Sequence, residues 1–210
     1  MGFSREFSQY GFCCGIDPPM PRPPRIFIAG VSHHVYQRGH NRSDIFAGDS
    51  DYRRFLWQAR KSMTNCGVDA HAFALMRNHY HFVVTPQTKD SLPDAMQDLL
   101  GEYTTYFNRK YSRSGTLWND RYHAKSIEDE RYWLNCLRYV EANPVEAGIV
   151  TTPESYRWTS YRVHAAGEPS QWLVLHPLYL RLGKTPLQRQ TAYRALWSSD
   201  PVPDWCPPGV

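Results

Sequence analysis

Runs in which apolar and polar residues alternate predict four β-strands along the chain. Two of these runs, residues 69–76 and 79–85, are separated only by Arg77 and Asn78, which fits the tight turn of a hairpin. The other two runs lie at residues 30–38 and 122–127. Ala70, Ala72 and Ala74 make one face of the first hairpin strand thin, so this face suits a closely packed helix.

Apolar residues at helical spacing predict three helices, one after the first strand and one on either side of the fourth. The first covers residues 52–66 and ends at Gly67. The second begins at Ser91, with Pro93 in its first turn. The length of 210 residues is enough for one domain with a core plus tails and marginal for two.

The third predicted helix covers residues 129–142. Because a residue that precedes proline is pushed out of the helical region, Pro144 predicts that this helix ends at Asn143. The resulting order is β-α-β-β-α-β-α. It predicts an α+β sandwich of the ferredoxin-like type, in which helices pack on a mostly antiparallel sheet.

The two ends of the chain differ from this central part. Residues 1–25 are rich in Pro, Gly and Arg without any period and are expected to form a flexible N-terminal arm. Residues 26–167 form the predicted domain, and residues 168–210 form a C-terminal extension with one short helix near 186–197. Met20 is a second candidate for the start of translation.

Composition narrows the class of protein. The five cysteines are odd in number, scattered and without a C-x-x-C pair, which disfavours a disulfide framework or a structural zinc site and indicates a reducing cytoplasm. No apolar run approaches 18 residues and no secretory signal opens the chain. A net charge of +4 leans mildly towards an anionic partner.

The stretch "MRNHYHFVVTP" places His79 and His81 one residue apart in a predicted strand. Residues i and i+2 of a strand point the same way, about 6.6 Å apart, so both imidazoles can converge on one ion. Two such ligands leave an open coordination sphere, which suits a catalytic metal. The alternative is that both rings cover the solvent face of a half-exposed sheet while Tyr80 and Phe82 face the core.

The third helix carries a second candidate pair in "RYVEANP". Tyr139 and Asn143 stand at i and i+4 and therefore on one helical face. A phenol and a carboxamide in this arrangement can act as a nucleophile and an oxygen ligand. The alternative is that Tyr139 packs on the sheet and Asn143 only caps the helix.

Together these two segments resemble the HUH single-tyrosine transposases, most closely the REP-associated tyrosine transposase group. The resemblance covers roughly residues 21–167. The strand motif H-Y-H differs from the family pattern only in its middle residue, Tyr80, which replaces an aliphatic one. The matching stretches are "PRPPRIFIAGVSHHVYQRGHNRSDIF", "ALMRNHYHFVV", "YFNRKYSRSGTLWNDRYHAKSIEDERYWLNCLRY", "LRYVEANPVEAG" and "YRWTSYRVHAAG".

The resemblance implies a metal-dependent transposase or nickase that cuts single-stranded DNA beside short palindromic hairpins of the REP type. By position, His79, His81 and Asn143 are the metal ligands, and Tyr139 is the nucleophile that forms a 5′-phosphotyrosine. Neutral imidazole and amide ligands favour Mn²⁺ over Mg²⁺, so activity with both and tighter binding of manganese are expected.

A basic and aromatic window at residues 101–125 is the predicted DNA-binding surface. It holds five Lys or Arg and two acidic residues, and basic groups track phosphates while aromatic faces stack unpaired bases. Tyr103, Tyr106 and Phe107 are expected to face the core instead. The residues expected to contact DNA are Arg109, Lys110, Arg113, Trp118 and Arg121, together with Arg22 and Arg25 of the arm.

One alternative of another class remains, a non-catalytic nucleic-acid-binding domain on the same fold. A binuclear zinc hydrolase is disfavoured because no Asp-His pair follows the H-x-H motif. A metallo-hydrolase of small molecules is disfavoured because nothing in the sequence indicates the closed apolar pocket that it would need. Some relatives act as domain-swapped dimers, but a monomer is the preferred expectation here.

Overall fold

The computed structural model describes residues 27–199. The predicted arm, its residues Arg22 and Arg25, and the alternative start at Met20 lie outside this range. Within it, no helix is both long enough and apolar enough to cross a membrane.

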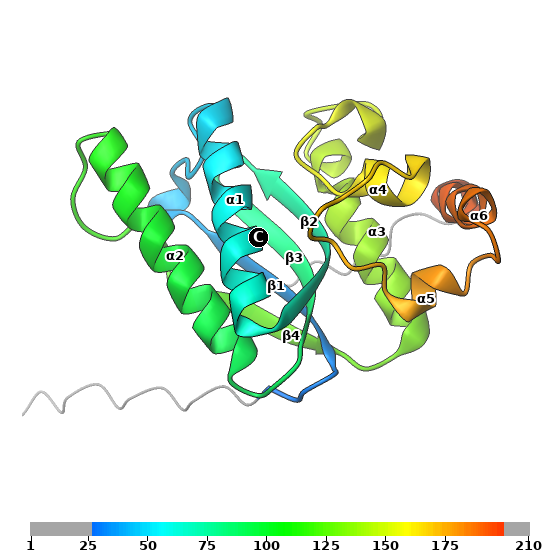
Figure 1. Ribbon diagram of the computed structural model, residues 1–210. Helices are drawn as coiled ribbons and strands as arrows, with labels where there is room; N and C mark the ends of the chain where they lie inside the picture. The colour runs from blue at the N-terminus through cyan, green and yellow to red at the C-terminus, as the bar shows by residue number, and fades with distance from the viewer. Residues whose placement is uncertain (1–26, 200–210) are drawn as a thin grey trace, which may run out of the picture.

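A single four-stranded antiparallel sheet forms the centre of the molecule (Figure 1). The strands lie in the spatial order β2-β3-β1-β4. This arrangement confirms the predicted mixed fold with an antiparallel sheet. The strand bounds are β1 Ser32–Arg38, β2 Val68–Met76, β3 His79–Pro86 and β4 His123–Ile127.

Helices α1 (Asp49–Cys66) and α2 (Ser91–Lys110) cover one face of the sheet (Figure 1). Gly67 ends α1 in the left-handed conformation with φ 69°, as its position predicts. The core beneath the two helices is strongly aromatic. It includes Phe55, Tyr80, Phe82, Tyr103 and Phe107.

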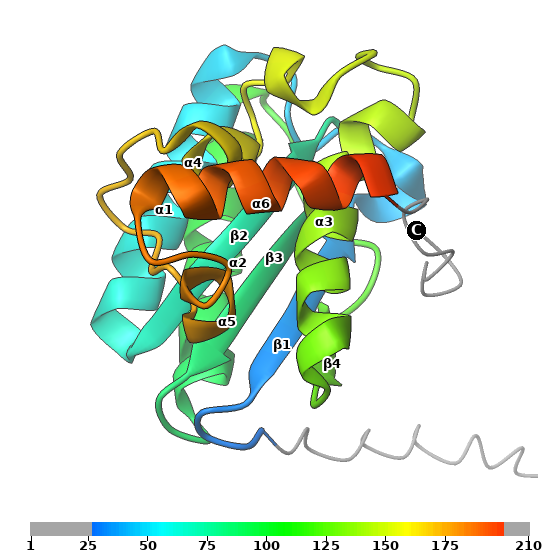
Figure 2. The same ribbon diagram turned by 90° about the vertical axis from the view of Figure 1, so that its right-hand side faces the viewer.

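Helix α3 (Glu130–Glu146) lies on the opposite face, where Ala72 and Ala74 leave room for it (Figures 1 and 2). Ala70 does not share this face, because the pairing register of β2 with β3 shifts between Ala70 and Ala72. Trp133 and Val140 of α3 pack against the alanine face. The sheet is therefore covered by helices on both sides.

The predicted end of α3 at Asn143 is wrong, because Pro144 lies inside the helix. Proline has no N–H with which to bond the carbonyl four residues earlier, which is that of Val140. The Asn143 side chain compensates, since its Nδ2 donates to the carbonyls of Val140 at 3.3 Å and Tyr139 at 2.8 Å. The helix continues for one further turn, to Glu146.

Three further helices, α4 (Tyr161–Ala166), α5 (Pro177–Leu180) and α6 (Pro186–Ser199), pack on the outer side of α3 (Figure 2). Helix α6 matches the helix expected near residues 186–197, whereas α4 and α5 were not predicted. The fully buried carboxylate of Glu141 on α3 joins this layer. It accepts hydrogen bonds from Ser160 at 2.6 Å and Tyr193 at 2.6 Å, and its other partner, His164 Nδ1, lies at 2.7 Å.

Candidate active site

Both histidines of the H-x-H strand face α3 rather than solvent. His81 is completely buried and His79 is partly buried. The alternative in which both rings cover an exposed sheet surface is therefore wrong, because α3 lies over this face. Tyr80 and Phe82 point the other way, into the core under α1 and α2, as expected.

Helix α3 brings the predicted nucleophile and third ligand to the same place. The rings of Tyr139 and His81 lie 5.9 Å apart at 90°, and those of His79 and His81 lie 5.1 Å apart. One helical turn beyond Tyr139, the Asn143 side chain lies close enough to His79 to raise its pKa against the effect of burial. The four residues named from the sequence thus converge on one site.

A fifth residue of this site, His34 on β1, was not identified from the sequence. Its Nε2 lies 2.9 Å from Nδ1 of His81, and its ring stacks on that of His81 with 5.1 Å between centroids. The ring of Tyr139 lies 5.8 Å from His34 as well. The available signal was the pair "HH" in the first strand, but only the pairing of β1 with β3 shows which of the two faces the site.

Each histidine of the H-x-H motif uses Nδ1 for a contact within the protein. Nδ1 of His79 bonds Oδ1 of Asn78 at 2.7 Å, and Nδ1 of His81 bonds His34. The Nε2 atom of His81 is buried and has no hydrogen-bond partner among the described residues. Metal-binding histidines typically hold their ring in this way, with one nitrogen fixed by a neighbour and the other left for the ion.

Burial keeps these imidazoles neutral, which is the form that binds metals. Burial, followed by the charge of Arg38, lowers the pKa of His79 to about 4. Burial, followed by Lys125, lowers the pKa of His34 to about 3. Burial likewise holds the pKa of His81 well below its ordinary value, with the neighbouring histidines and Arg38 adding to the effect.

Asn143 contributes to the site in a defined orientation. Because its Nδ2 donates to the carbonyls of α3, the amide oxygen is the atom left to face His79. Within residues 27–199 no group of three His, Cys, Asp or Glu side chains is placed to hold a metal. A metal at this site would therefore rely on two imidazoles and this amide oxygen.

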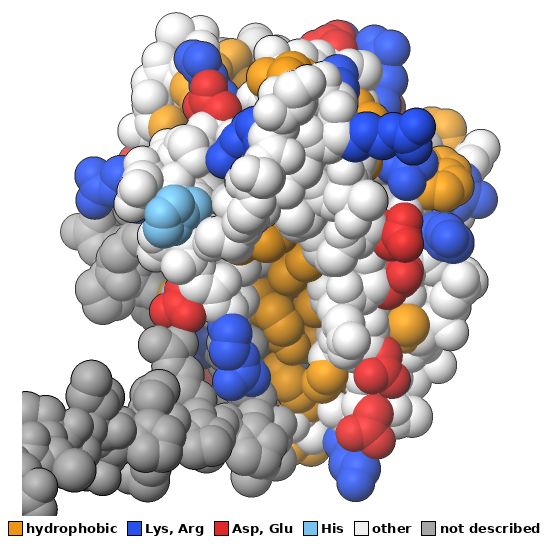
Figure 3. Space-filling model, turned by 90° about the vertical axis from the view of Figure 1, so that its left-hand side faces the viewer, with side chains coloured by type: hydrophobic (Ala, Val, Ile, Leu, Met, Phe, Trp, Pro, Cys, Tyr) orange, Lys and Arg blue, Asp and Glu red, His pale blue; other side chains and the backbone are white. Residues whose placement is uncertain are grey.

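The predicted DNA-contact residues differ in whether their side chains are exposed or already paired within the protein. Arg109, Arg113 and Arg121 are exposed. Lys110, however, forms an ion pair at 2.5 Å with the buried carboxylate of Asp51. On the side of the molecule seen in Figure 3, Lys and Arg side chains alternate with Asp and Glu rather than forming one continuous basic patch.

The prediction that Trp118 contacts DNA is wrong, because this residue packs in the core instead of lying on the surface. Its side chain is only 9% exposed, its ring meets that of Tyr80 edge-on at 5.8 Å, and its Nε1 donates to Thr104 Oγ1 at 2.8 Å. The loop that carries it folds back on the end of β1, with a backbone bridge between Gly39 and Trp118. Its ring therefore offers no free face on which a base could stack.

Comparison with known proteins places this protein in the class of transposases. The family model described as "Transposase IS200 like" matches residues 28–143, more than half of the chain, and the chain belongs to this family. The predicted resemblance to tyrosine transposases is thereby confirmed. None of the curated proteins matches the chain.

One of the similar solved structures agrees with the fold. A REP-associated tyrosine transposase bound to a REP hairpin is similar with a TM-score of 0.57 and 18% identity, over 76% of this chain and 90% of that one. A Deinococcus radiodurans R1 protein described as a transposase has a TM-score of 0.41 and 16% identity, over 58% of this chain and 96% of that one. At these identities the likeness to the first structure shows the fold alone.

Proposed function

We propose that this transposase-family protein cuts single-stranded DNA through a covalent bond between Tyr139 and a 5′-phosphate. The observation that carries the proposal is the convergence of Tyr139 with the buried, neutral pair His81 and His34 beneath α3. The preferred DNA is an unpaired strand beside a short palindromic hairpin. The REP hairpin bound by the structurally similar transposase supports this substrate.

The residues present fit a divalent metal, because the buried Nε2 of His81 lacks a partner among the described residues and faces the same site as His79. We assign His79, His81 and the amide oxygen of Asn143 as the ligands, with Mn²⁺ preferred over Mg²⁺. When bound, such a cation supplies positive charge that neutralises and orients the scissile phosphate.

The remaining chemistry belongs to the side chains of the chain itself. The phenolic oxygen of Tyr139 attacks phosphorus, its proton leaves, and the 3′-oxygen of the upstream strand departs as a hydroxyl. His34 holds His81 in the tautomer whose Nδ1–H donates to His34, so that Nε2 keeps its lone pair. Asn143 is held by the carbonyls of α3, which fixes its position relative to Tyr139.

Rejoining of strands follows from the same bond. The phosphotyrosine is itself a phosphodiester, so an incoming 3′-hydroxyl can displace Tyr139 without a separate energy source. This property distinguishes a strand-transfer enzyme from a simple nuclease.

The deciding experiment uses hairpin-flanked single strands with Mn²⁺ and a denaturing gel. A label at the 3′ end should appear in a protein adduct, whereas a label at the 5′ end should appear in a free fragment. Tyr139→Phe should abolish the adduct. Tyr132→Phe is the matched control, since it makes the same change two turns earlier on α3 and should keep the adduct. An adduct that survives Tyr139→Phe would move the nucleophile elsewhere.

Metal binding can be tested without activity. A ligand present at 100 times its Kd stabilises the folded state by about 2.7 kcal/mol. Mn²⁺ should therefore raise the melting temperature of the wild type and of Tyr139→Phe, but not that of His81→Ala or His79→Ala. DNA binding without any adduct or metal-dependent shift would instead favour the non-catalytic nucleic-acid-binding domain.

A further inference from the structure

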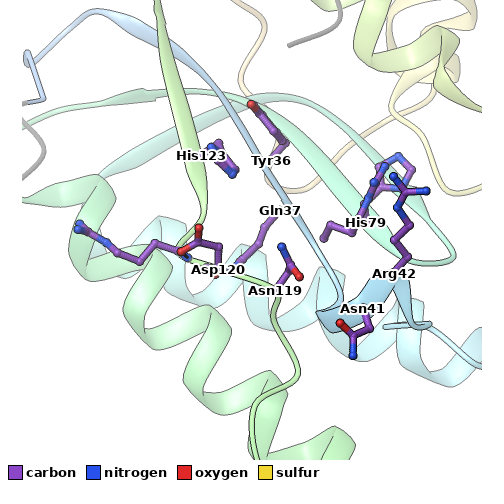
Figure 4. A pocket seen from close by; sticks show the side chains of 10 residues that line it. Tyr36, Gln37, Asn41, Arg42, His79, Asn119, Asp120 and His123 are labelled. Atoms are coloured by element: carbon purple, nitrogen blue, oxygen red, sulfur yellow. Dashed lines mark hydrogen bonds between the residues drawn. The ribbon is translucent and has the colours of Figure 1, made fainter. Parts of the chain in front are cut away.

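A polar cavity opens directly beside His79. Its volume is about 520 Å³, within the range of about 300–1,000 Å³ that small-molecule sites occupy. Its lining comes from five segments, shown in Figure 4: the end of β1, the turn that holds Asn41 and Arg42, the start of β3 at His79, the loop of residues 119–121, and the start of β4 at His123. Only His79 of this lining has a role in the proposed cleavage.

The position of the cavity follows from the path of α3 across the sheet. The first turns of α3 lie over the end of β4, where Trp133 packs on Ile127, and later turns lie over Ala72 and Ala74 of β2. The opposite corner, formed by the end of β1 and the start of β4, stays open. Tyr36 and His123 face each other across this corner and are stacked, with 4.8 Å between ring centroids and an angle of 11°.

The walls of the cavity are held in place by the protein before any ligand binds. Asn119 N–H donates to the Arg38 carbonyl at 3.0 Å, and the Asn78 side chain donates to the Arg42 carbonyl at 3.2 Å. Asn41 and Arg42 have φ values of 50° and 58°, in the left-handed region that asparagine tolerates but that is unfavourable for arginine. Such strain is retained where the surrounding structure enforces it, and it is concentrated at functional sites.

The chemistry of the lining matches one unpaired nucleotide. The lining carries three arginines, Arg38, Arg42 and Arg121, against a single acidic residue, Asp120. Its net positive charge favours an anion. The stacked ring of exposed His123 offers a flat surface to a base. The amides of Asn41 and Asn119 carry both donors and acceptors, as the edge of a base requires.

We propose that this cavity binds the unpaired nucleotide next to the scissile phosphate and reads its base through Asn41 and Asn119, with its base packed on His123. The inference rests on the proposed DNA cleavage at Tyr139 and adds the origin of its sequence preference. The contact of the cavity with His79 carries it, because the cavity lies directly beside the position at which the proposed site would hold the scissile phosphate.

The test uses a hairpin oligonucleotide library in which the unpaired flanks are randomised. Covalent adducts formed with Mn²⁺ are captured and their DNA is sequenced. Wild-type protein should show a base preference in the flank, and Asn119→Ala and Asn41→Gly should each remove it at one position only. Asn41→Gly is compatible with the positive φ. Asn65→Ala, an exposed substitution on α1 across the sheet, is the matched control and should change nothing.

A second measurement addresses the stacking. An abasic site at the selected position should slow wild-type cleavage by about tenfold or more, as expected for one lost stacked base. His123→Ala should cause a similar loss on intact DNA and little further loss on the abasic strand. If adducts form but every preference survives in the Asn variants, the cavity does not read the base. If wild-type protein forms no adduct with any strand, the proposed function fails and this inference falls with it.

Discussion

The carboxylate of Glu141 allows a quantitative test of what holds α3 in place. Tyr193 of α6 donates its hydroxyl to Glu141 Oε2 at 2.6 Å, and both side chains are completely buried. Burial, followed by the nearby carboxylate, holds the pKa of Tyr193 well above its ordinary value, so its proton stays in place for donation. Tyr193→Phe removes this one donor and leaves a buried carboxylate oxygen with one partner fewer.

The stability that Tyr193→Phe should lose depends on whether the acceptor of its hydrogen bond is charged. A hydrogen bond to a charged group is worth about 1.5–3 kcal/mol, whereas one between neutral groups is worth about 0.5–1.5 kcal/mol. Tyr179 provides the matched control, because its hydroxyl donates at 2.7 Å to the neutral carbonyl of His164 and its side chain is only 2% exposed. Tyr193→Phe should therefore destabilise the protein by about 1 kcal/mol more than Tyr179→Phe.

Urea unfolding of both variants and the wild type measures this difference. In a chain of this size each kcal/mol corresponds to about 2–4 °C in melting temperature, so thermal unfolding gives an independent value. Equal losses in the two variants, or a larger loss for Tyr179→Phe, would refute the idea that the Glu141 carboxylate anchors α3 to the C-terminal helices. A double variant that loses the sum of the two effects would show that the two hydrogen bonds act independently.

Three further predictions concern stability. Asp51→Asn should cost about 3 kcal/mol or more in urea unfolding, because it removes the charge of a fully buried carboxylate that accepts hydrogen bonds from Lys110, Tyr106, Tyr111 and two backbone N–H groups. Burial, followed by His71, lowers the pKa of His176 to about 4 against about 6.5 in the unfolded chain. The free energy of unfolding is therefore unaffected by His176 above pH 6.5 and decreases from pH 6.5 towards pH 4, by at most about 1.4 kcal/mol per pH unit from this residue. His176→Gln should reduce the pH dependence of the free energy of unfolding in this range. Gly39→Ala places a methyl group against the Ser43 carbonyl oxygen and should lower the free energy of unfolding by about 1–3 kcal/mol. Thermal unfolding should show this loss as a lower melting temperature.

The strands and the long helices could be predicted because their patterns are local. Period-two alternation located β2 and β3 to within a residue, and the i, i+4 spacing alone put Tyr139 and Asn143 on one face. The short helices α4 and α5 have six and four residues, too few for a helical period to be visible. Their existence depends on packing against α3 rather than on their own sequence.

His34 and Trp118 show what the sequence could not supply. His34 joins the site only because β1 pairs antiparallel with β3 in a register that puts Tyr36 opposite His81. Trp118 lies in a polar loop whose composition is typical of a surface, and its burial depends on the return of that loop to Gly39. Both positions are decided by contacts between segments that are distant along the chain, which a pattern of neighbouring residues does not encode.

Pro144 is an exception to the rule that proline ends a helix, and this exception bears on the candidate site. Proline normally ends or kinks a helix because it leaves a carbonyl unpaired, and here the amide of Asn143 pairs with that carbonyl. The same hydrogen bond fixes which atom of Asn143 faces His79, since the nitrogen is used by the helix and the oxygen remains. An ordinary residue at position 144 would direct its own N–H to the Val140 carbonyl and leave the Asn143 amide with its hydrogen bond to Tyr139 alone. The proline that falsified the predicted helix end therefore helps to orient the oxygen that the proposed metal site requires.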